Sequence, residues 1–394
     1  MPPARPRRNR GPIRVCVVTG TRAEYGLLRA VMAALKADRA FELRVVASAM
    51  HLAPEFGLTY REIEADGFRI NAKVDMLLAA DTAEATAKSM GLGMIGFVDA
   101  FRRLKPDLIM LLGDRFEALA AASTAVVLRI PIVHLSGGDV TEGAFDDAIR
   151  HAITKMSHLH FVASAQAAAR VRQMGEDPKR VFAVGDPGLD SLRRTKRLSR
   201  RSLERDLGMV FRRRNVLVTF HPVTLDRTPS TRQFAVLLDA LDALGPDVGL
   251  IFTKPNADPE GRALMAMLDA FVAKRPNAVA FASLGHRRYL SVMAQCDAVV
   301  GNSSSGLLEA PSLKKPAVNI GNRQAGRLRA KTVIDCPVEV RAITRAMNKA
   351  FSMRIRRAVN PYGDGHAAER IMRVLRRIRD PSVLLHKSFR DSHG

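Results

Sequence analysis

Short apolar runs rich in β-branched residues alternate with longer amphipathic segments along almost the whole chain. In the first half we predict six buried strands, at 14–20, 43–49, 107–113, 131–135, 159–163 and 181–185. Segments with helical spacing lie between most of them, for example 24–37, 83–104 and 115–128. This alternation predicts right-handed βαβ units and a parallel sheet covered by helices on both faces.

The same rhythm restarts after a basic segment near the middle of the chain. Strands are predicted at 216–221, 249–253, 278–282, 298–301 and 317–320. A chain of 394 residues exceeds what one core usually fills, so two α/β domains are expected. We place a disordered basic tail at 1–13, a first Rossmann-like domain at 14–190 and a second at 191–360. Residues 361–394 would supply a basic helix, at 370–379, that packs back on the first domain, followed by a tail.

The net charge of +23 changes the range of partners to consider, because it attracts nucleic acid, anionic membranes or phosphorylated metabolites. The basic excess is concentrated at 5–10, 193–214 and 370–379, where Phe211 is the single aromatic residue, and Trp is absent. A base-stacking groove needs such aromatics, so we expect no nucleic-acid partner as the main function. The middle segment is better explained as a solvated linker or surface helix.

The cysteines and the apolar runs indicate the compartment. Cys16, Cys296 and Cys336 lie in or beside apolar runs without metal-ligand spacing, as is typical of buried, reduced thiols. No apolar run approaches the roughly 20 residues that cross a bilayer, and 15–18 is too short for a signal-peptide core. We therefore expect a cytoplasmic protein with no membrane partner.

The stretch GNSSSG at 301–306 is the most informative motif of the chain. It follows a predicted strand and precedes a predicted helix at 307–313, so backbone N–H groups and hydroxyls would point outward at the positive end of a helix dipole. That arrangement suits a diphosphate, and Glu309, one turn into the helix, could accept hydrogen bonds from a ribose diol. An ordinary capped helix is the alternative for this motif taken alone.

Other loops that follow strands are also rich in polar chemistry. In the first half they carry Arg22, then Asp114-Arg115, and then Ser136 to Gly143 with Asp139, Asp146-Asp147 and Arg150-His151. Asp146/Arg150 and Asp147/His151 are i,i+4 pairs, which would be plain surface ion pairs if they stood alone. In the second half, His221 and Lys254 could contact a diphosphate, and Asn256 a polar edge of the ligand. Ligands of open parallel sheets bind at these carboxyl ends of strands.

Two further patterns carry less weight. The segment 91–96 matches G-x-G-x-x-G, but helical residues precede it where a dinucleotide fingerprint needs a strand. His158 and His160 have no cysteine or carboxylate partners at metal-ligand spacing, so a core or rim histidine pair is expected and no metal site is predicted.

In these motifs the chain resembles the hydrolysing UDP-N-acetylglucosamine 2-epimerases of the sialic-acid and legionaminic-acid pathways. The resemblance covers residues 14–380 in order and rests on TGTRAEY (19–25), HLAPEFG (51–57), GDRFE (113–117), GGD (137–139) with Asp146-Asp147 and Arg150-His151, HPVT (221–224), KPN (254–256) and GNSSSG (301–306). It implies a GT-B fold of two Rossmann-like domains with the active site in the interdomain cleft, and a reaction without metal or cofactor.

The implied reaction removes the sugar C2 proton, expels UDP from C1, and hydrates the resulting 2-acetamidoglucal to a free 2-epimeric sugar. Carried over by motif, Asp114, Asp139, Asp146 and Asp147 are the acid–base candidates, Arg115 and Arg150 orient them or the substrate, and His221 assists the leaving group. The residues implied to bind substrate and UDP are Arg22, His51, Lys254, Asn256, Ser303, Ser304, Glu309 and Arg323. We expect a nucleotide-sugar as partner and a homodimer as assembly.

One position departs from the family pattern. Better-known members carry an acidic residue two positions after the equivalent of His134, where this chain has Ser136, a poor base. Asp139 or Glu142 is then the substitute, or the substrate differs, as in members that use UDP-2,4-diacetamido-trideoxyhexoses. A non-hydrolysing 2-epimerase that returns UDP-ManNAc and a GT-B glycosyltransferase remain the alternative functions.

Overall fold

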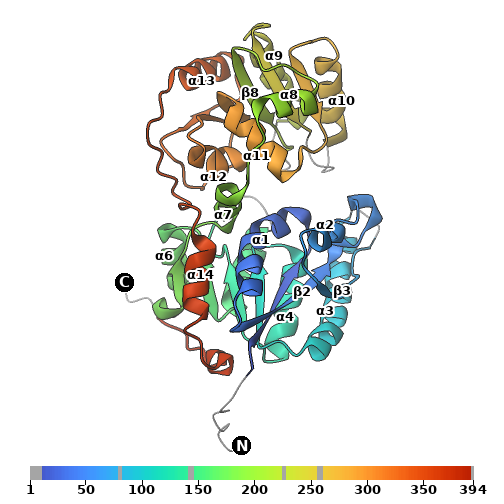
Figure 1. Cartoon of the computed structure of the whole chain (residues 1–394), viewed down its shortest axis with the longest axis vertical. Coiled ribbons are helices and arrows are strands. Elements are labelled where there is room, and N and C mark those ends of the chain that lie inside the picture. Colours follow the sequence, from blue (N-terminus) through green and yellow to red (C-terminus); the bar gives the residue numbers. More distant parts are fainter. Residues whose placement is uncertain (1–10, 79–81, 141–145, 224–227, 255–260, 392–394) are drawn as a thin grey trace, which may run out of the picture. The chain divides into compact units, whose positions relative to one another are not determined.

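The computed structural model describes residues 11–78, 82–140, 146–223, 228–254 and 261–391. These residues form two compact α/β units (Figure 1). Unit 1 holds the described residues up to 140, from 146 to 191 and from 365 onward, and unit 2 holds those from 192 to 364. In this described part of the chain, no helix is long and apolar enough to cross a membrane.

Unit 1 is built on a parallel seven-stranded sheet in the order β3-β2-β1-β4-β5-β6-β7. Its strands are β1 (Ile13–Thr19), β2 (Phe41–Ser48), β3 (Ile70–Val74), β4 (Leu108–Leu112), β5 (Ile132–Leu135), β6 (Leu159–Val162) and β7 (Val181–Ala183). Its helices are α1 (Arg22–Ala37), α2 (Tyr60–Ala65), α3 (Ala83–Leu104), α4 (Phe116–Val127), α5 (Asp146–Met156), α6 (Ala165–Gln173) and α14 (Ala367–Leu375), and α7 (Pro187–Arg194) spans the border with unit 2.

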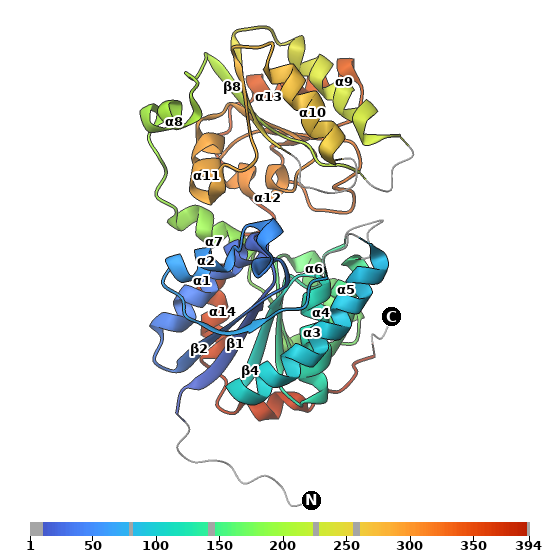
Figure 2. The same cartoon turned by 90° about the vertical axis from the view of Figure 1, so that its right-hand side faces the viewer.

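The sheet of unit 1 is buried on both faces, because alternate residues of β1 enter different cores. Val15 and Val17 pack with residues of α1 and α14, whereas Cys16 and Val18 pack with residues of α3 and α4. Figure 2 shows α1 and α14 on one side of the sheet and α3 and α4 on the other. This two-sided burial explains why the strands read as continuous apolar runs in the sequence.

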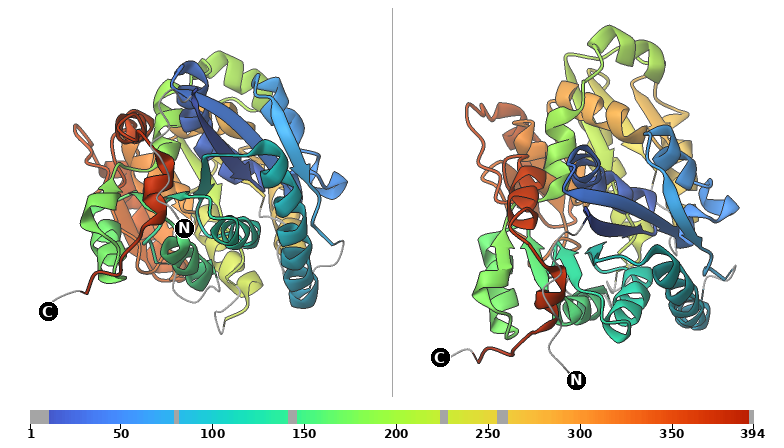
Figure 3. Two further views of the ribbon diagram at one scale, coloured as in Figure 1. Left: turned by 90° about the horizontal axis from the view of Figure 1, so that it is seen from below. Right: turned by 60° about the horizontal axis from the view of Figure 1, so that its bottom comes forward.

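Helix α14 returns the end of the chain to unit 1. Buried Asp190 caps its start by accepting hydrogen bonds from Ala367 N at 2.8 Å and Ala368 N at 3.0 Å. The segment after α14 passes alongside α6 (Figure 3), where Arg390 N donates to Gly175 O at 3.0 Å. The predicted helix at 370–379 was misplaced, since α14 begins three residues earlier and ends at Leu375. Its start depends on a cap 177 residues away in sequence, which local pattern cannot reveal.

Unit 2 repeats the architecture with a parallel six-stranded sheet in the order β10-β9-β8-β11-β12-β13. Its strands are β8 (Arg214–Thr219), β9 (Val248–Thr253), β10 (Ala278–Phe281), β11 (Ala298–Gly301), β12 (Ala317–Ile320) and β13 (Val333–Cys336). Its helices are α8 (Arg200–Leu207), α9 (Ser230–Asp242), α10 (Gly261–Val272), α11 (Gly285–Gln295), α12 (Ser305–Ser312) and α13 (Val340–Ser352). Val216 and Val218 of β8 pack with α9 and α13, and Leu217 packs on the opposite face with α8 and α11.

The prediction of two parallel α/β sheets is confirmed. Each predicted strand begins and ends within two residues of an observed strand. Two strands were missed, β3 and β13, and both lie at a sheet edge. Polar Asn71 and Lys73 interrupt β3, and Asp335 interrupts β13, so neither forms an apolar run. An edge strand pairs with another strand on one side only, so it is partly exposed and tolerates polar residues.

Gly301 at the end of β11 has a backbone that only glycine can adopt. Its φ is +134°, and a Cβ would lie 1.9 Å from the carbonyl oxygen of Thr219 on the neighbouring strand β8. We expect Gly301→Ala to destabilise the protein by about 3 kcal/mol, because both the conformation and the contact are forbidden to alanine. Denaturant unfolding checks this. Gly306→Ala in α12 is the matched control, since its Cβ would meet only Ala317 Cβ at 3.4 Å.

Candidate functional site

Arg150 of α5 gathers the carboxyl ends of β4 and β5 in unit 1. Its side chain is 4% exposed and ion-pairs with Asp114, which follows β4. The same guanidinium donates to Asp147 Oδ1 at 3.2 Å and to the backbone carbonyl of Asp139, after β5, at 2.8 Å. Asp147 also contacts His151 Nε2 at 3.4 Å, as the i,i+4 spacing predicts. One buried cation therefore brings together three segments that the sequence keeps far apart.

Asp146, at the start of α5, is a carboxyl of this group whose pKa is raised. Burial, together with the negative charge of Asp114, raises the pKa of Asp146 above its ordinary value, although Arg115 and Arg150 oppose the shift. Two carboxyls with different environments can divide the roles of base and acid between them. Here Asp114 is ion-paired with Arg150, whereas the environment of Asp146 favours the protonated form.

Two further carboxyls, Glu24 and Glu117, lie buried beside this group. Glu117 is 1% exposed and accepts a hydrogen bond from Arg115 Nε at 2.6 Å, while its Oε2 has no partner among the described residues. Glu24 accepts from Gly20 N at 2.7 Å. Burial and the charge of Glu117 raise the pKa of Glu24 to about 8. A Cβ on Gly20 would overlap Glu117 Oε1, so both carboxyls pack against this one glycine.

This raised pKa sets the sign of a pH effect on stability. The folded protein retains the Glu24 proton up to about pH 8, whereas the unfolded chain loses it near the ordinary value of 4.5, so folding binds a proton between these limits. Wild-type stability should therefore fall as the pH rises from 6.5 to 8.5, a window that avoids most histidine titration. Each unit of pKa displacement corresponds to about 1.4 kcal/mol.

The matched variant for this effect is Glu24→Gln, which keeps an oxygen for the bond from Gly20 N. We expect its free energy of unfolding, measured by urea titration at pH 6.5, 7.5 and 8.5, to decline by ~1–2 kcal/mol less than that of the wild type. Parallel declines in the two proteins would show that Glu24 does not titrate in this range.

Two buried histidines contact residues at the carboxyl ends of β1 and β4. His51 is completely buried, with Nε2 3.1 Å from Thr19 Oγ1 and Nδ1 2.8 Å from Thr59 Oγ1, and burial lowers its pKa to about 4. His134 Nε2 lies 2.7 Å from the carbonyl of Gly113, which precedes Asp114. Both nitrogens of His51 lie within hydrogen-bond distance of hydroxyls, and its contact with the substrate stays a prediction.

Ser136 has an unusual backbone at the position where the sequence departs from the family pattern. Its φ is +61°, in the left-handed region that few non-glycine residues adopt, and its N–H donates to Phe161 O at 2.8 Å. Gly137 and Gly138 follow, and the chain then reaches Asp139, whose carbonyl meets Arg150. Glu142, the other proposed substitute for the missing acid, lies outside the described residues.

In unit 2, Asn302 ties the GNSSSG loop to His221 after β8. Asn302 Oδ1 accepts from His221 N at 2.7 Å, and its Nδ2 donates to His221 O at 2.8 Å. His221 Nδ1 is buried without a partner in the described part of the chain, and burial lowers the ring's pKa to about 4, aided by the charge of Arg323. The ring is thus neutral at physiological pH and keeps an uncommitted nitrogen at the carboxyl edge of the sheet.

The serine loop itself has the predicted strand–loop–helix form. Ser304 immediately precedes α12 and makes no side-chain cap, whereas Ser303 Oγ accepts a hydrogen bond from Ser305 N, the first residue of the helix, at 3.4 Å. Ser303 Oγ accepts from Ser305 Oγ at 3.3 Å. Glu309 lies one turn into α12, and Arg323 Nη1 donates to Asn302 O at 3.2 Å. His221, Ser303 and Arg323 therefore lie around one loop.

The remaining predicted contacts lie away from these groups or are engaged elsewhere. Lys254, one residue after β9, pairs with Asp269 of α10 at 2.7 Å. Arg22 at the start of α1 donates to Glu62 of α2 at 3.0 Å. Asn256 lies outside the described residues, as does Thr224 of the HPVT motif.

The G-x-G-x-x-G match at 91–96 and the pair of His158 and His160 both have structural explanations. The G-x-G-x-x-G match lies inside α3, as its helical surroundings predict. His160 Nε2 lies 2.9 Å from Glu176 Oε2 in a buried pair, and His158 Nδ1 accepts from Ile132 N at 3.1 Å. Over the described ranges no group of three or more His, Cys, Asp or Glu side chains could hold a metal ion.

Sequence reasoning left three residues of these sites without a role: Glu24, Glu117 and Asn302. Each lies in a quoted motif, but its position there does not indicate what it contacts. Their residue type could have indicated a role, because a carboxylate or amide that is buried between apolar elements needs polar partners.

Comparisons with known proteins bear on the family and the fold of the chain. The model of the UDP-N-acetylglucosamine 2-epimerase family matches residues 33–376. The chain is 40% identical to the GDP/UDP-N,N'-diacetylbacillosamine 2-epimerase (hydrolyzing) of Campylobacter jejuni, over 96% of this chain and 99% of that protein. It is 36% identical to the UDP-N,N'-diacetylbacillosamine 2-epimerase (hydrolyzing) of Legionella pneumophila, over 95% and 98%.

Among solved structures, the UDP-GlcNAc 2-epimerase of Neisseria meningitidis bound to UDP-GlcNAc superposes with a TM-score of 0.80. That match covers 93% of this chain and 100% of the other. Because the sequences are only 16% identical, it shows a shared fold and nothing more. With the two parallel sheets it confirms the GT-B class expected from the motifs. The match to the family model over most of the chain, and the two relatives above 30% identity, make this protein a member of the UDP-N-acetylglucosamine 2-epimerase family.

Proposed function

We propose that this protein is a hydrolysing 2-epimerase that converts a UDP-2,4-diacetamido-trideoxyhexose to UDP and the free 2-epimeric sugar, for nonulosonic acid biosynthesis of the legionaminic acid type. The observation that carries the reaction is the group of carboxylates around buried Arg150 at the carboxyl ends of β4 and β5. The choice of sugar is supported by the names of the two relatives at 40% and 36% identity and by Ser136, which marks a departure from the UDP-GlcNAc pattern.

The proposed chemistry assigns different steps to the two kinds of carboxyl. Asp114 removes the C2 proton while the C1–O bond breaks and its electron pair leaves with UDP, which gives a glycal with a C1=C2 double bond. A protonated carboxyl then gives a proton to C2 from the opposite face while water adds its OH to C1, and the other proton of the water passes to the carboxylate so formed. Asp146 is suited to that step because its environment favours the protonated form. Asp139 is the alternative acid.

The nucleotide is assigned to the carboxyl edge of unit 2. Ser303, Ser304 and the start of α12 would bind the diphosphate, Glu309 the ribose diol, and Arg323 would balance the diphosphate charge. Neutral His221 would hydrogen-bond the leaving phosphate oxygen. Arg22 and Asn256 remain proposed contacts of UDP, whereas Lys254 would first have to leave Asp269.

The test is proton NMR of the purified protein in D₂O with UDP-2,4-diacetamido-trideoxyglucose and, separately, UDP-GlcNAc. We expect free UDP and a 2-epimeric sugar deuterated at C2, formed at least ~10-fold faster from the diacetamido substrate. An intact UDP-linked 2-epimer as the product would indicate a non-hydrolysing epimerase. Turnover that requires an added acceptor would indicate a glycosyltransferase, and faster turnover of UDP-GlcNAc would overturn the proposed sugar.

We also propose that the protein forms a homodimer through α3 and α4, which pack side by side on unit 1. These two helices expose Leu92, Ile95 and Val127, the last two at 67% and 77%, and exposed apolar side chains favour burial against a second copy. Light scattering should give twice the chain mass of 43.2 kDa. Val127→Asp should yield monomers, whereas Val359→Asp, at a singly exposed valine of unit 2, should not.

A further inference from the structure

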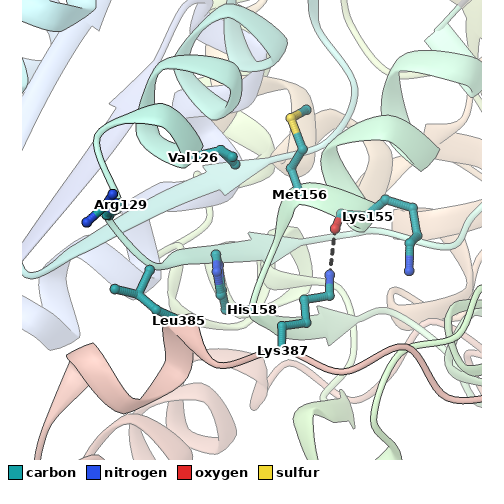
Figure 4. Close-up of a pocket in the computed structure, with 7 residues that line it drawn as sticks. All are labelled: Val126, Arg129, Lys155, Met156, His158, Leu385 and Lys387. Atoms are coloured by element: carbon teal, nitrogen blue, oxygen red, sulfur yellow. Dashed lines mark hydrogen bonds between the residues drawn. The ribbon is translucent and has the colours of Figure 1, made fainter. Parts of the chain in front are cut away.

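A cavity of about 460 Å³ opens at the amino edge of the unit 1 sheet, where β5 and β6 begin. This edge is opposite to the one that carries Asp114 and Asp139. Val126 of α4 and Arg129 after it form one wall, the end of α5 with Lys155 and Met156 forms another, and Lys387 of the C-terminal segment forms a third (Figure 4). Nothing in the proposed reaction uses this cavity.

His158 supplies a hydrogen-bond donor to the cavity. Its side chain is 93% buried, and Nδ1 accepts from Ile132 N at 3.1 Å, which places the proton of the neutral ring on Nε2. Burial and the nearby charges of Lys387 and Arg180 lower the pKa of His158 to about 4, so the ring is neutral at pH 7. Nε2 makes no hydrogen bond in the described part of the chain, so its N–H is available to a ligand in the cavity.

The charges around the cavity are unbalanced toward positive. Lys155 and Lys387 both pair with one carboxylate, Glu176, at 2.7 Å and 2.8 Å. Arg180 donates to backbone carbonyls of the C-terminal segment, and the guanidinium of Arg129 has no side-chain or backbone partner within the described residues. Lys155 and Lys387 thus share one carboxylate, and Arg129 and Arg180 pair with none among the described residues, so an anion in the cavity would balance an excess of positive charge.

The third wall is held in place without a ligand. Arg180 donates to the carbonyls of Leu384 and His386, both at 2.8 Å. Lys387 Nζ donates to the carbonyls of Lys155 and Ser157 at 2.5 Å and 2.7 Å, the first of which is drawn in Figure 4. Because these bonds already fix the segment, a ligand would enter a formed site and would not have to order one.

We propose that this cavity binds a small anionic metabolite, a phosphate ester or carboxylate with an apolar face. Its charged group meets the Arg129 guanidinium and the Nε2–H of His158, and its body lies against Val126 and Met156. The chain would therefore hold two separate ligands, a nucleotide-sugar at the carboxyl edges of its sheets and an anion at the amino edge of unit 1.

The experiment is calorimetric titration of the full-length protein with glucose 6-phosphate at low salt, with UDP present in excess so that the nucleotide site cannot take the phosphate. Glucose is the uncharged control, and inorganic phosphate tests whether the anion alone suffices. Arg129→Gln removes the free guanidinium at an exposed position. Arg39→Gln, at an exposed arginine on the same edge of the sheet, is the matched control, and Arg129→Lys tests rescue by charge.

We expect saturable binding of about one glucose 6-phosphate per chain, at least ~10-fold weaker in Arg129→Gln, unchanged in Arg39→Gln and partly restored in Arg129→Lys. Inorganic phosphate should bind more weakly than the ester, and equal affinities would identify free phosphate as the ligand of the same site. Equal binding of glucose, equal affinity in Arg129→Gln, or no saturable binding of either anion would each overturn the proposal.

Discussion

Asp114→Asn is expected to lower kcat at least ~1,000-fold and to leave the affinity for UDP within about twofold of the wild-type value. The amide cannot accept the C2 proton, and loss of a positioned general base typically costs 10²–10⁴-fold. Asp114 belongs to unit 1, whereas the proposed diphosphate contacts come from the loops after β8 and β11 in unit 2. The measurement is UDP release from the sugar nucleotide together with calorimetric titration of UDP.

Asp147→Asn separates proton transfer from the positioning of Arg150. Asp147 also pairs with Arg150, so this variant weakens the hold on the same guanidinium without removing the proposed base. We expect it to lose ~10-fold or less in kcat and to keep exchange of the C2 proton with solvent. Equal losses in the two variants would mean that Asp114 acts only through Arg150. Weak UDP binding by Asp114→Asn would remove Asp114 from the chemistry.

His221→Ala is expected to reduce kcat by ~100-fold and UDP affinity by ~10-fold. A hydrogen bond to the departing phosphate oxygen strengthens as negative charge develops there, so its loss costs more in the transition state than in the bound state. The backbone of residue 221 is held from both sides by Asn302, so the truncated side chain should leave the loop in place.

The matched control for His221 is His366→Ala, which removes an exposed ring paired with Glu369. It should retain full activity and UDP affinity. Measurement of kcat and of the UDP dissociation constant for both variants decides the assignment. Full turnover by His221→Ala would exclude the ring from leaving-group assistance, and an unchanged kcat with weaker UDP binding would limit it to nucleotide binding.

The fold could be predicted from the sequence because a strand that is buried on both faces of a sheet forms a continuous apolar run. Central strands such as β4, with five buried apolar residues in a row, and β11 could be located within one or two residues. The edge strands β3 and β13 could not, since one exposed side allows polar residues there. The start of α14 also escaped prediction, because Asp190 fixes it from another part of unit 1.

The candidate site was predictable in its residue types and in its position at strand ends. The sequence placed Asp114, Asp146 and Asp147 together because carboxyl ends of parallel strands share one edge. It could not show that Arg150 is buried among them, since a spacing of three or four residues on a helix describes a surface ion pair equally well. Nor could it show that the His51 ring lies between the hydroxyls of Thr19 and Thr59.

The sequence by itself determined the parallel α/β class, the two-part organisation, the motifs and hence the family, because these depend on local pattern and on residues adjacent in the chain. Only the tertiary structure decided which groups share a charge environment. Glu24 and Glu117 meet at Gly20, Asn302 hydrogen-bonds the backbone of His221, and Lys155 and Lys387, which line a cavity, both pair with Glu176. Burial and charge proximity are properties of folded distance, and they set the protonation state of each group.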